Sequence, residues 1–365
     1  MKVVRRFIYR EVATSVAFTT LAFLALFFFF DLIDELRWVG HGGYRLTHAL
    51  LFVSLSLPTH LYELLPITVL IGTIFVMARL AQSSEFTILR TSGLGPWRAL
   101  AALLLLGALF SALTFAIGDY LAPASERMAQ LVRARGVGGL SSGATGAWLK
   151  ERDGGHSRAI NVRAIEGDGS LRGIRVFEFD ARGRVAQTLQ AARAVFDENG
   201  AAWQLSQVER SVFEHQGEQL RVRRLKEERL TWPTRISPDM VAASLLSPER
   251  MGTLELYRYI DHLQANGQSA QRYAIAFWRK VFYPLGCLVM VVLSLPFAYL
   301  HFRSKGIAAS IFGGVMAGIS FFLLNNVFGF AGHLQNWTPW LTAAAPGLIY
   351  STLSLCAFAW LVLRR

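Results

Sequence analysis

The stretches IRVFEF (174–179) and WQLSQV (203–208) alternate apolar with polar residues, imperfectly, as half-buried β-strands do. Dipeptides that tolerate a positive φ, such as Arg182-Gly183 and Asn199-Gly200, separate the strand-like stretches at intervals of about ten residues. This spacing favours a sandwich, a jelly roll or an open barrel over an α/β domain. We therefore predict an all-β domain within the polar stretch from about Leu121 to Gln271.

Apolar segments of membrane length flank this polar stretch. Apolar residues make up 53% of the chain and charged residues 17%, against roughly 25% charged residues in soluble domains. Because a span needs about 20 apolar residues, six spans are predicted, at Val12–Phe30, Leu61–Leu80, Ala99–Gly118, Val281–Leu300, Ile307–Phe330 and Leu341–Leu363. The apolar run that starts at Leu46 is too long for one crossing, so we expect Pro58 to separate a short surface helix from the second span.

The net charge of +12 comes mostly from Arg, and much of it lies beside the spans. Such an excess can indicate nucleic-acid binding, but beside spans the anionic lipid headgroups are the simpler partner, so we expect no nucleic acid. Lys and Arg occur at the amino end, after spans two and four, and at the carboxyl end. The positive-inside rule therefore predicts cytoplasmic termini and a polar domain on the outer side. The first segment lacks a convincing cleavage site, which favours a retained anchor.

The expected organisation has four parts. They are transmembrane helices 1–3 with a cytoplasmic helix at about 84–93 (1–120), the β-domain (121–250), a periplasmic helix leading into the membrane (251–271), and transmembrane helices 4–6 (272–365). The periplasmic helix is predicted from an apolar recurrence every three residues, at Leu254, Tyr257, Ile260 and Leu263.

Catalytic motifs are absent from the sequence. There is no phosphate-binding G-x-x-x-x-G-K-[ST] loop, no H-E-x-x-H, no G-x-S-x-G and no Cys/His cluster. Cys287 and Cys356 both fall inside apolar spans, which suggests no disulfide or metal ligation. We therefore expect no catalytic residue, no metal and no cofactor bound by this chain, and any energy for work must come from another subunit.

The loop between spans two and three contains a short predicted helix. Ser84 can cap it, Glu85 lies in its first turn, and Gly93 can end it. Phe86 and Leu89 then share a face that could dock into the groove of a partner ATPase. A helix that merely lies on the membrane is an equally good interpretation.

Several polar residues near the outer ends of the spans are further candidates. Glu63 is costly in hydrocarbon unless it faces a cavity or a partner. Arg133 and Arg135 follow span three and could pair with phosphates, or could be solvated. The cluster that ends span one fits ordinary interfacial anchoring, with Asp31, Asp34, Glu35, Arg37 and Trp38. On span five, Ser310, Gly314 and Gly318 permit close helix approach, within this chain or in a dimer, and Asn325 and Asn326 can hydrogen-bond to other helices.

The order and spacing of several stretches together resemble a known family. These stretches are Val3–Arg10, Asp34–Gly40, Ser56–Pro58, Leu80–Gly93, Ala122-Pro123 through Arg135, Trp203–Val208 and Trp278–Leu285. Over essentially the whole chain they are similar to the LptF/LptG permeases of the lipopolysaccharide exporter, and more to the LptG type. The resemblance implies six transmembrane helices with an inserted periplasmic β-jelly-roll domain, in the bacterial inner membrane.

The resemblance also implies partners and site residues. An LptF-type permease would complete a cavity open to the outer leaflet, an LptB-type ATPase dimer would use ATP and Mg below it, and an LptC-type periplasmic jelly-roll protein would receive the lipopolysaccharide. The ATPase contact would be Ser84, Glu85, Phe86, Leu89 and Arg90. The lipid cavity would include Phe30, Arg37, Trp38, Glu63, Arg133 and Asn325, with Arg133 near lipid A phosphates. The chain has Asp31 and Trp38 where some relatives have lysines, which leaves Arg37 as the nearby cation.

Two alternatives stay open from the sequence. The nearer one is the paralogous LptF role, or a permease for another lipid. The more distant one is a membrane-anchored scaffold whose β-domain binds a partner protein. Copurification of an ATPase through the Glu85 loop would distinguish transport from a scaffold.

Overall fold

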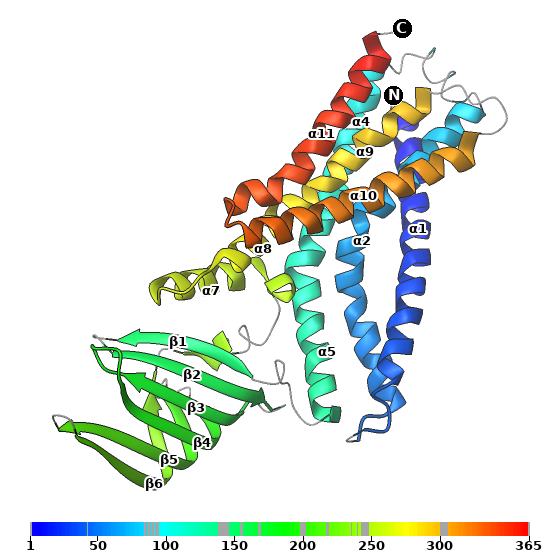
Figure 1. Ribbon diagram of the computed structural model, residues 1–365. Helices are drawn as coiled ribbons and strands as arrows, with labels where there is room; N and C mark the ends of the chain where they lie inside the picture. Colours follow the sequence, from blue (N-terminus) through cyan, green and yellow to red (C-terminus); the bar gives the residue numbers. More distant parts are fainter. Residues whose placement is uncertain are drawn as a thin grey trace. The chain divides into compact units, whose positions relative to one another are not determined.

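The computed structural model describes residues 2–41, 43–83, 85, 88, 91, 95–137, 146–153, 156–166, 169–197, 202–216, 219–234, 236–238, 240–241, 248–299 and 306–363 (Figure 1). Contacts divide the chain into two compact units. The helical unit comprises Met1–Asp31, Ser56–Ser125 and Gln271–Arg365, and the sheet unit comprises Leu32–Leu55 and Glu126–Ala270.

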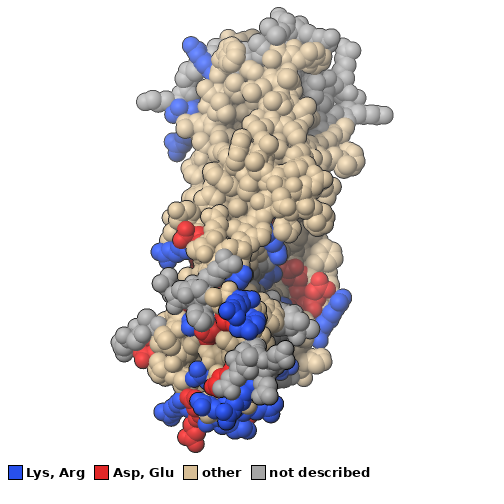
Figure 2. Space-filling view, turned by 60° about the vertical axis from the view of Figure 1, so that its left-hand side comes forward, with Lys and Arg blue, Asp and Glu red and all other residues tan. Residues whose placement is uncertain are grey.

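Long helices account for most of the described chain. They are α1 (Lys2–Leu36), α2 (Leu46–Gln82), α4 (Pro96–Ala116), α5 (Ala122–Val137), α7 (Thr253–Ala265), α8 (Gln271–Phe282), α9 (Gly286–Tyr299), α10 (Gly306–Leu334) and α11 (Pro339–Leu363). Short turns are η1 (Ile117–Leu121, π-helical), η2 (Pro248–Arg250) and η3 (Tyr283–Leu285). Within the described residues, six segments are long and apolar enough to cross a membrane, which confirms the predicted number of spans. Over the face seen in Figure 2, the helical unit carries a broad band without charged side chains.

Several helix boundaries differ from the prediction; among them, the helical stretch of the third span continues past Gly118 through η1 and α5 to Val137. The prediction that Pro58 ends a separate surface helix is wrong, because α2 continues through both Pro58 and Pro66 over 37 residues. Membrane helices tolerate proline since neighbouring groups can satisfy the carbonyls that it frees. The fourth span was expected as one helix from Val281, but η3 at Tyr283–Leu285 separates α8 from α9 at Pro284.

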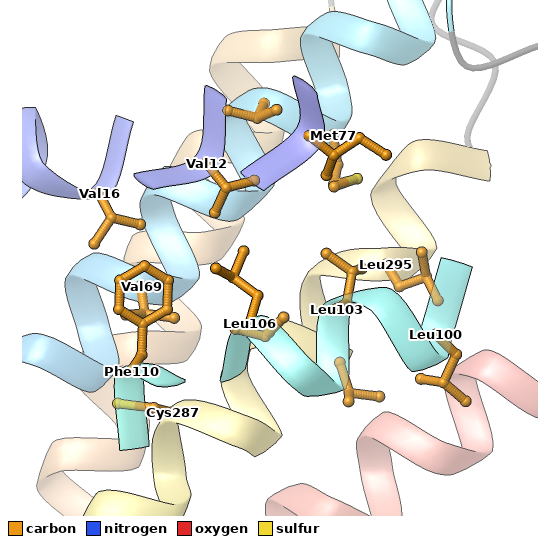
Figure 3. Close-up of a cluster of buried hydrophobic side chains, with 14 of the residues drawn as sticks. Val12, Val16, Val69, Met77, Leu100, Leu103, Leu106, Phe110, Cys287 and Leu295 are labelled. Atoms are coloured by element: carbon orange, nitrogen blue, oxygen red, sulfur yellow. The ribbon is translucent and has the colours of Figure 1, made fainter. Parts of the chain in front are cut away.

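Apolar side chains of α1, α2, α4 and α9 interlock in the core of the helical unit. Figure 3 shows Val12 and Val16 of α1 beside Val69 of α2 and Leu106 of α4. In lipid such a core is stabilised by close packing rather than by water exclusion. On α10 the predicted Gly314 and Gly318 serve packing within the chain, whereas the side chain of Ser310 lies outside the described residues. A Cβ added to Gly314 would lie 2.6 Å from Ile74, and one added to Gly318 would lie 2.9 Å from Ile67.

The inserted domain is built on one antiparallel sheet, which confirms the all-β prediction. Its strands are β1 (Ala147–Asp153), β2 (His156–Ile165), β3 (Leu171–Phe179), β4 (Val185–Asp197), β5 (Ala202–Gln216) and β6 (Gln219–Pro233). The described strands pair in the order β1-β2-β3-β4-β5-β6, which is a meander rather than the Greek-key order of a jelly roll. Short connections between consecutive strands produce this order. Gly183 turns one of them with a φ of +75°, as predicted, whereas Asn199-Gly200 lies outside the described residues.

One face of the sheet forms its own core. Buried side chains from five strands meet Ile236 and Val241, which follow β6; among them are Ile160, Val176, Leu189 and Trp203. The Trp203 indole Nε1 donates a 2.8 Å hydrogen bond to the Ile236 carbonyl, which ties the segment after β6 to this core. Leu205 and Val208 are both buried although they are three positions apart, an odd spacing that would place them on opposite faces of a regular strand. Gln207 has a φ of +53° and resets the alternation. In α7 the buried residues are Leu256, Tyr259 and Leu263, while Leu254 and Tyr257 are exposed.

Candidate functional site

The most distinctive polar site of the sheet unit is centred on Arg133, near the end of α5. Its guanidinium carbon lies 5.1 Å from the ring centroid of Trp38 and 5.3 Å from that of Phe52. A cation placed over aromatic faces at such distances is held by the ring quadrupoles. The Arg133 side chain remains one-third exposed. Two rings therefore restrain the guanidinium without enclosing it.

A buried carboxylate also lies close to this arginine. Glu35, in the last turn of α1, places its Oε1 3.7 Å from the Arg133 Nε. The Tyr44 hydroxyl donates a 2.7 Å hydrogen bond to the same carboxylate oxygen, and both side chains are buried. Burial, reinforced by the hydrogen bond to Glu35, raises the pKa of the Tyr44 phenol well above its ordinary value, so Tyr44 stays protonated and donates.

A tight connection between α1 and α2 brings these residues together. The Gly40 amide donates a 2.9 Å hydrogen bond to the Tyr44 carbonyl, which closes the chain into a small loop. Gly40 has a φ of +94°, a left-handed conformation that favours glycine. The loop returns Tyr44 to Glu35 and keeps Trp38 beside them.

This geometry suits an anionic oxygen ligand. A guanidinium has five N–H donors in a planar fork, which matches phosphate or carboxylate oxygens. Among the described residues, the recorded contacts of Arg133 are the Glu35 carboxylate at 3.7 Å and the two rings. Since 3.7 Å exceeds the range of a hydrogen bond, the donors of Arg133 are available to a ligand.

The other predicted cavity residues are not among the recorded contacts of Arg133 in the described part of the chain. Arg37 contacts Asp34 at 3.4 Å on the exposed side of α1, away from the Glu35 pair. Three belong to the helical unit: Phe30 and Glu63 are exposed, whereas Asn325 is buried and donates a 2.9 Å hydrogen bond to the Phe321 carbonyl in its own helix. The Glu63 main-chain carbonyl accepts a 2.5 Å hydrogen bond from the Tyr283 hydroxyl. The side chain of Arg135 lies outside the described residues.

The predicted cytoplasmic helix is described at three positions. Glu85, Ile88 and Thr91 are helical and exposed, with Ile88 62% exposed. Their spacing of three residues places them on neighbouring turns of one side of a helix. The predicted contact residues Ser84, Phe86, Leu89 and Arg90 lie outside the described residues.

Metal ligation finds no support in the described part of the chain. In that part, no group of three or more His, Cys, Asp or Glu side chains lies close enough to hold a metal ion. The two cysteines are free, Cys287 buried and Cys356 exposed.

Glu35, Tyr44 and Phe52 were not among the residues predicted for the lipid cavity. One signal was available: Glu35 and Trp38 are three apart and so share one face, whereas Asp34 and Arg37 share another. Tyr44 and Phe52 carried no comparable signal, because a loop and a new helix separate them from Glu35.

Comparison with known proteins agrees with this architecture. The family model described as "Lipopolysaccharide export system permease LptF/LptG" matches residues 6–364. The chain is 28% identical to the lipopolysaccharide export system permease protein LptG of Escherichia coli (strain K12), over 100% of this chain and 98% of that protein. It is also 28% identical to LptG of Haemophilus influenzae, over 99% of this chain and 98% of that protein. The chain therefore belongs to the LptF/LptG family, the permeases of the lipopolysaccharide export system.

Proposed function

We propose that this chain is the LptG-type half of an exporter that lifts lipopolysaccharide out of the outer leaflet of the inner membrane. An LptF-type permease would complete the cavity, and an LptB-type ATPase dimer would hydrolyse ATP with Mg beneath it. This chain would then pass the lipid to an LptC-type protein of the periplasmic β-jelly-roll bridge. Both termini would be cytoplasmic and the sheet unit periplasmic. The basic loops support this orientation, as does the position of the first turn of α1 and the last turn of α11 at one end of the helical unit (Figure 1).

The energetics of the lipid require a driven, apolar route. Exposing acyl chains to water costs about 0.8 kcal/mol per CH₂ group, so a multi-acyl lipid does not leave the bilayer unaided. The outer half of α1 offers an apolar surface for such a route, since Phe29 and Phe30 are more than half exposed. Because the sequence has no nucleotide-binding loop, the energy would enter from a partner through the helical segment around Glu85.

The observation that carries the proposal is the restrained, partly exposed Arg133 guanidinium. Lipid A phosphates are divalent or nearly so at neutral pH, and they are matched by a planar fork of N–H donors. Trp38 and Phe52 hold the guanidinium in place and present apolar surface to the acylated part of the lipid. The cluster therefore suits an amphiphile with a phosphate on an apolar body.

Lipid capture is tested with the full-length chain in nanodiscs of neutral lipid. The ligand is a phosphorylated glucosamine-disaccharide lipid, and its dephosphorylated form is the reference. Arg133→Ala should weaken binding of the phosphorylated lipid by about tenfold, as expected for one charge-assisted contact, and leave the reference unchanged. Arg127→Ala is the matched control, because Arg127 lies on the same helix but pairs with Glu255 at 2.7 Å. Equal binding by both variants would refute capture at Arg133.

Energy coupling is tested separately by copurification from detergent. Wild-type chain should bring down a paralogous permease and an ATPase, and Glu85→Arg should lose the ATPase. Glu228→Arg makes the same charge reversal on the exposed face of β6 and should retain it. If Glu85→Arg retained the ATPase fully, Glu85 would not be part of the ATPase contact. If wild-type chain brought down neither the permease nor the ATPase, the result would favour the alternative of a membrane-anchored scaffold.

A further inference from the structure

We infer that Glu35 is an internal competitor for the anionic headgroup. It holds Arg133 while the site is empty, and it weakens lipid binding so that the phosphate can leave. The inference rests on the proposed capture of lipid phosphate by Arg133. It assigns a positioning role to a carboxylate that does not itself touch the lipid.

The first ground is where the negative charge lies. The side chain of Glu35 is 7% exposed, and burial of a carboxylate requires partners. Its two recorded partners are the Tyr44 hydroxyl at 2.7 Å and Arg133 at 3.7 Å. A lipid phosphate bound to Arg133 would therefore share one guanidinium with a fixed negative charge.

The second ground is the length of the Glu35–Arg133 contact. In a hydrogen-bonded arginine–carboxylate pair the nitrogen–oxygen distance is about 2.7–2.9 Å, whereas the distance from the Arg133 Nε to the Glu35 Oε1 is 3.7 Å. The short bond of Glu35 is made to Tyr44 instead, so the carboxylate stays anchored whether or not Arg133 is engaged elsewhere. Arg133 can thus exchange one anion for another without leaving Glu35 unpartnered.

The third ground is the requirement of transport itself. A conducting site must bind its cargo well enough to load it and weakly enough to release it. An arginine that contacted two rings and no opposing charge would hold a phosphate tightly. A neighbouring carboxylate lowers the affinity through like-charge repulsion and re-forms the ion pair when the lipid leaves.

The test is Glu35→Gln, which removes the charge and keeps an oxygen that accepts from Tyr44. In neutral-lipid nanodiscs, this variant should bind the phosphorylated glucosamine-disaccharide lipid about fivefold more tightly, with slower dissociation and unchanged binding of the dephosphorylated form. Asp34→Asn is the matched control: it removes the same charge one residue away, from a carboxylate that contacts Arg37 rather than Arg133. Its affinity should stay within about twofold of wild type, because exposed charges are screened.

A double variant separates this inference from the proposed function. In an Arg133→Ala background, Glu35→Gln should have no effect on affinity, since the competition acts through the guanidinium. If Arg133→Ala weakens binding but Glu35→Gln binds like wild type or more weakly, the competitor role is refuted and lipid capture stands. If Arg133→Ala binds like wild type, lipid capture itself fails.

A second variant covers the case in which Glu35→Gln does not fold. Tyr44→Phe removes the hydroxyl that anchors Glu35, so the carboxylate can close onto Arg133. Affinity for the phosphorylated lipid should then fall about threefold, the opposite direction from Glu35→Gln. An unchanged or tighter affinity in Tyr44→Phe would overturn the inference.

Discussion

Lys280 donates a 2.8 Å hydrogen bond from its Nζ to the main-chain carbonyl oxygen of Gly118, and the lysine side chain is buried. Gly118 lies in the π-helical turn η1, where the amide of Ala122 bonds to Ile117 instead of to Gly118. The next residue, Pro123, has no N–H to offer. The Gly118 carbonyl thus lacks the amide donors that an α-helix or a π-helix would supply from these two positions, and a side chain from α8 donates to it.

Replacement of Lys280 by Met should destabilise the helical unit. It leaves the Gly118 carbonyl buried without this donor, and loss of a hydrogen bond to a charged group costs about 1.5–3 kcal/mol. Unfolding by denaturing detergent measures the effect. Pro123→Ala supplies the missing backbone N–H, so the double variant should recover part of the loss. If Lys280→Met were as stable as wild type, or if adding Pro123→Ala recovered no stability, the proposed role of the Lys280–Gly118 hydrogen bond would be contradicted.

Thr20 of α1 and Thr68 of α2 should show a measurable coupling. The Thr20 hydroxyl donates a 2.9 Å hydrogen bond to the Thr68 hydroxyl, and both side chains are buried. Side-chain hydrogen bonds between membrane helices average about 0.6 kcal/mol, with a maximum near 1.7. A double-mutant cycle with Thr20→Val and Thr68→Val should give a coupling in that range. Thr19→Val is the control, since Thr19 bonds to Ser15 in its own helix, and its cycle with Thr68→Val should give none.

The overall architecture was accessible from the sequence because its determinants are local. Bilayer thickness sets the length of an apolar span, and the alternation in 174–179 and 203–208 follows directly from strand geometry. The Pro58 prediction failed since it treated the helix as isolated, whereas neighbouring helices and lipid alter the cost of a proline. The change of alternation at Gln207 could not be predicted either, because this residue has a positive φ but is not a glycine.

The candidate site was only partly predictable because its pairs are distant in sequence. Trp38 and Arg133 were both named as cavity residues, but nothing in the sequence placed one over the other. Asp31 was read as a departure from the family's lysines, whereas its carboxylate lies 2.6 Å from the His60 Nε2, so it joins α1 to α2. Neither pairing follows from periodicity, since each depends on how separate helices pack.

Gly72 of α2 should be among the least replaceable glycines of the helical unit. A Cβ added there would lie 2.8 Å from the Val16 nitrogen and 2.9 Å from its Cα. Backbone atoms cannot turn aside as a flexible side chain can, so α1 would have to move. Gly72→Ala should lower the free energy of unfolding by about 1–3 kcal/mol. Gly313→Ala and Gly347→Ala meet nothing within 4 Å and should be neutral or slightly stabilising; similar losses at all three positions would contradict the packing.

His262 of α7 should make the sheet unit less stable as pH falls. Burial lowers the pKa of this imidazole, and the nearby carboxylates of Glu151 and Asp261 offset only part of the effect. The unfolded chain therefore takes up a proton first, near the ordinary histidine value of about 6.5, and stability falls as pH drops from there through the folded-state pKa. Hydrogen exchange of the β1–β6 amides between about pH 7.5 and pH 5 measures the slope. His262→Gln should flatten it, whereas His41→Gln, in the exposed loop after α1, should not; an unchanged slope in His262→Gln would assign the pH dependence to other groups.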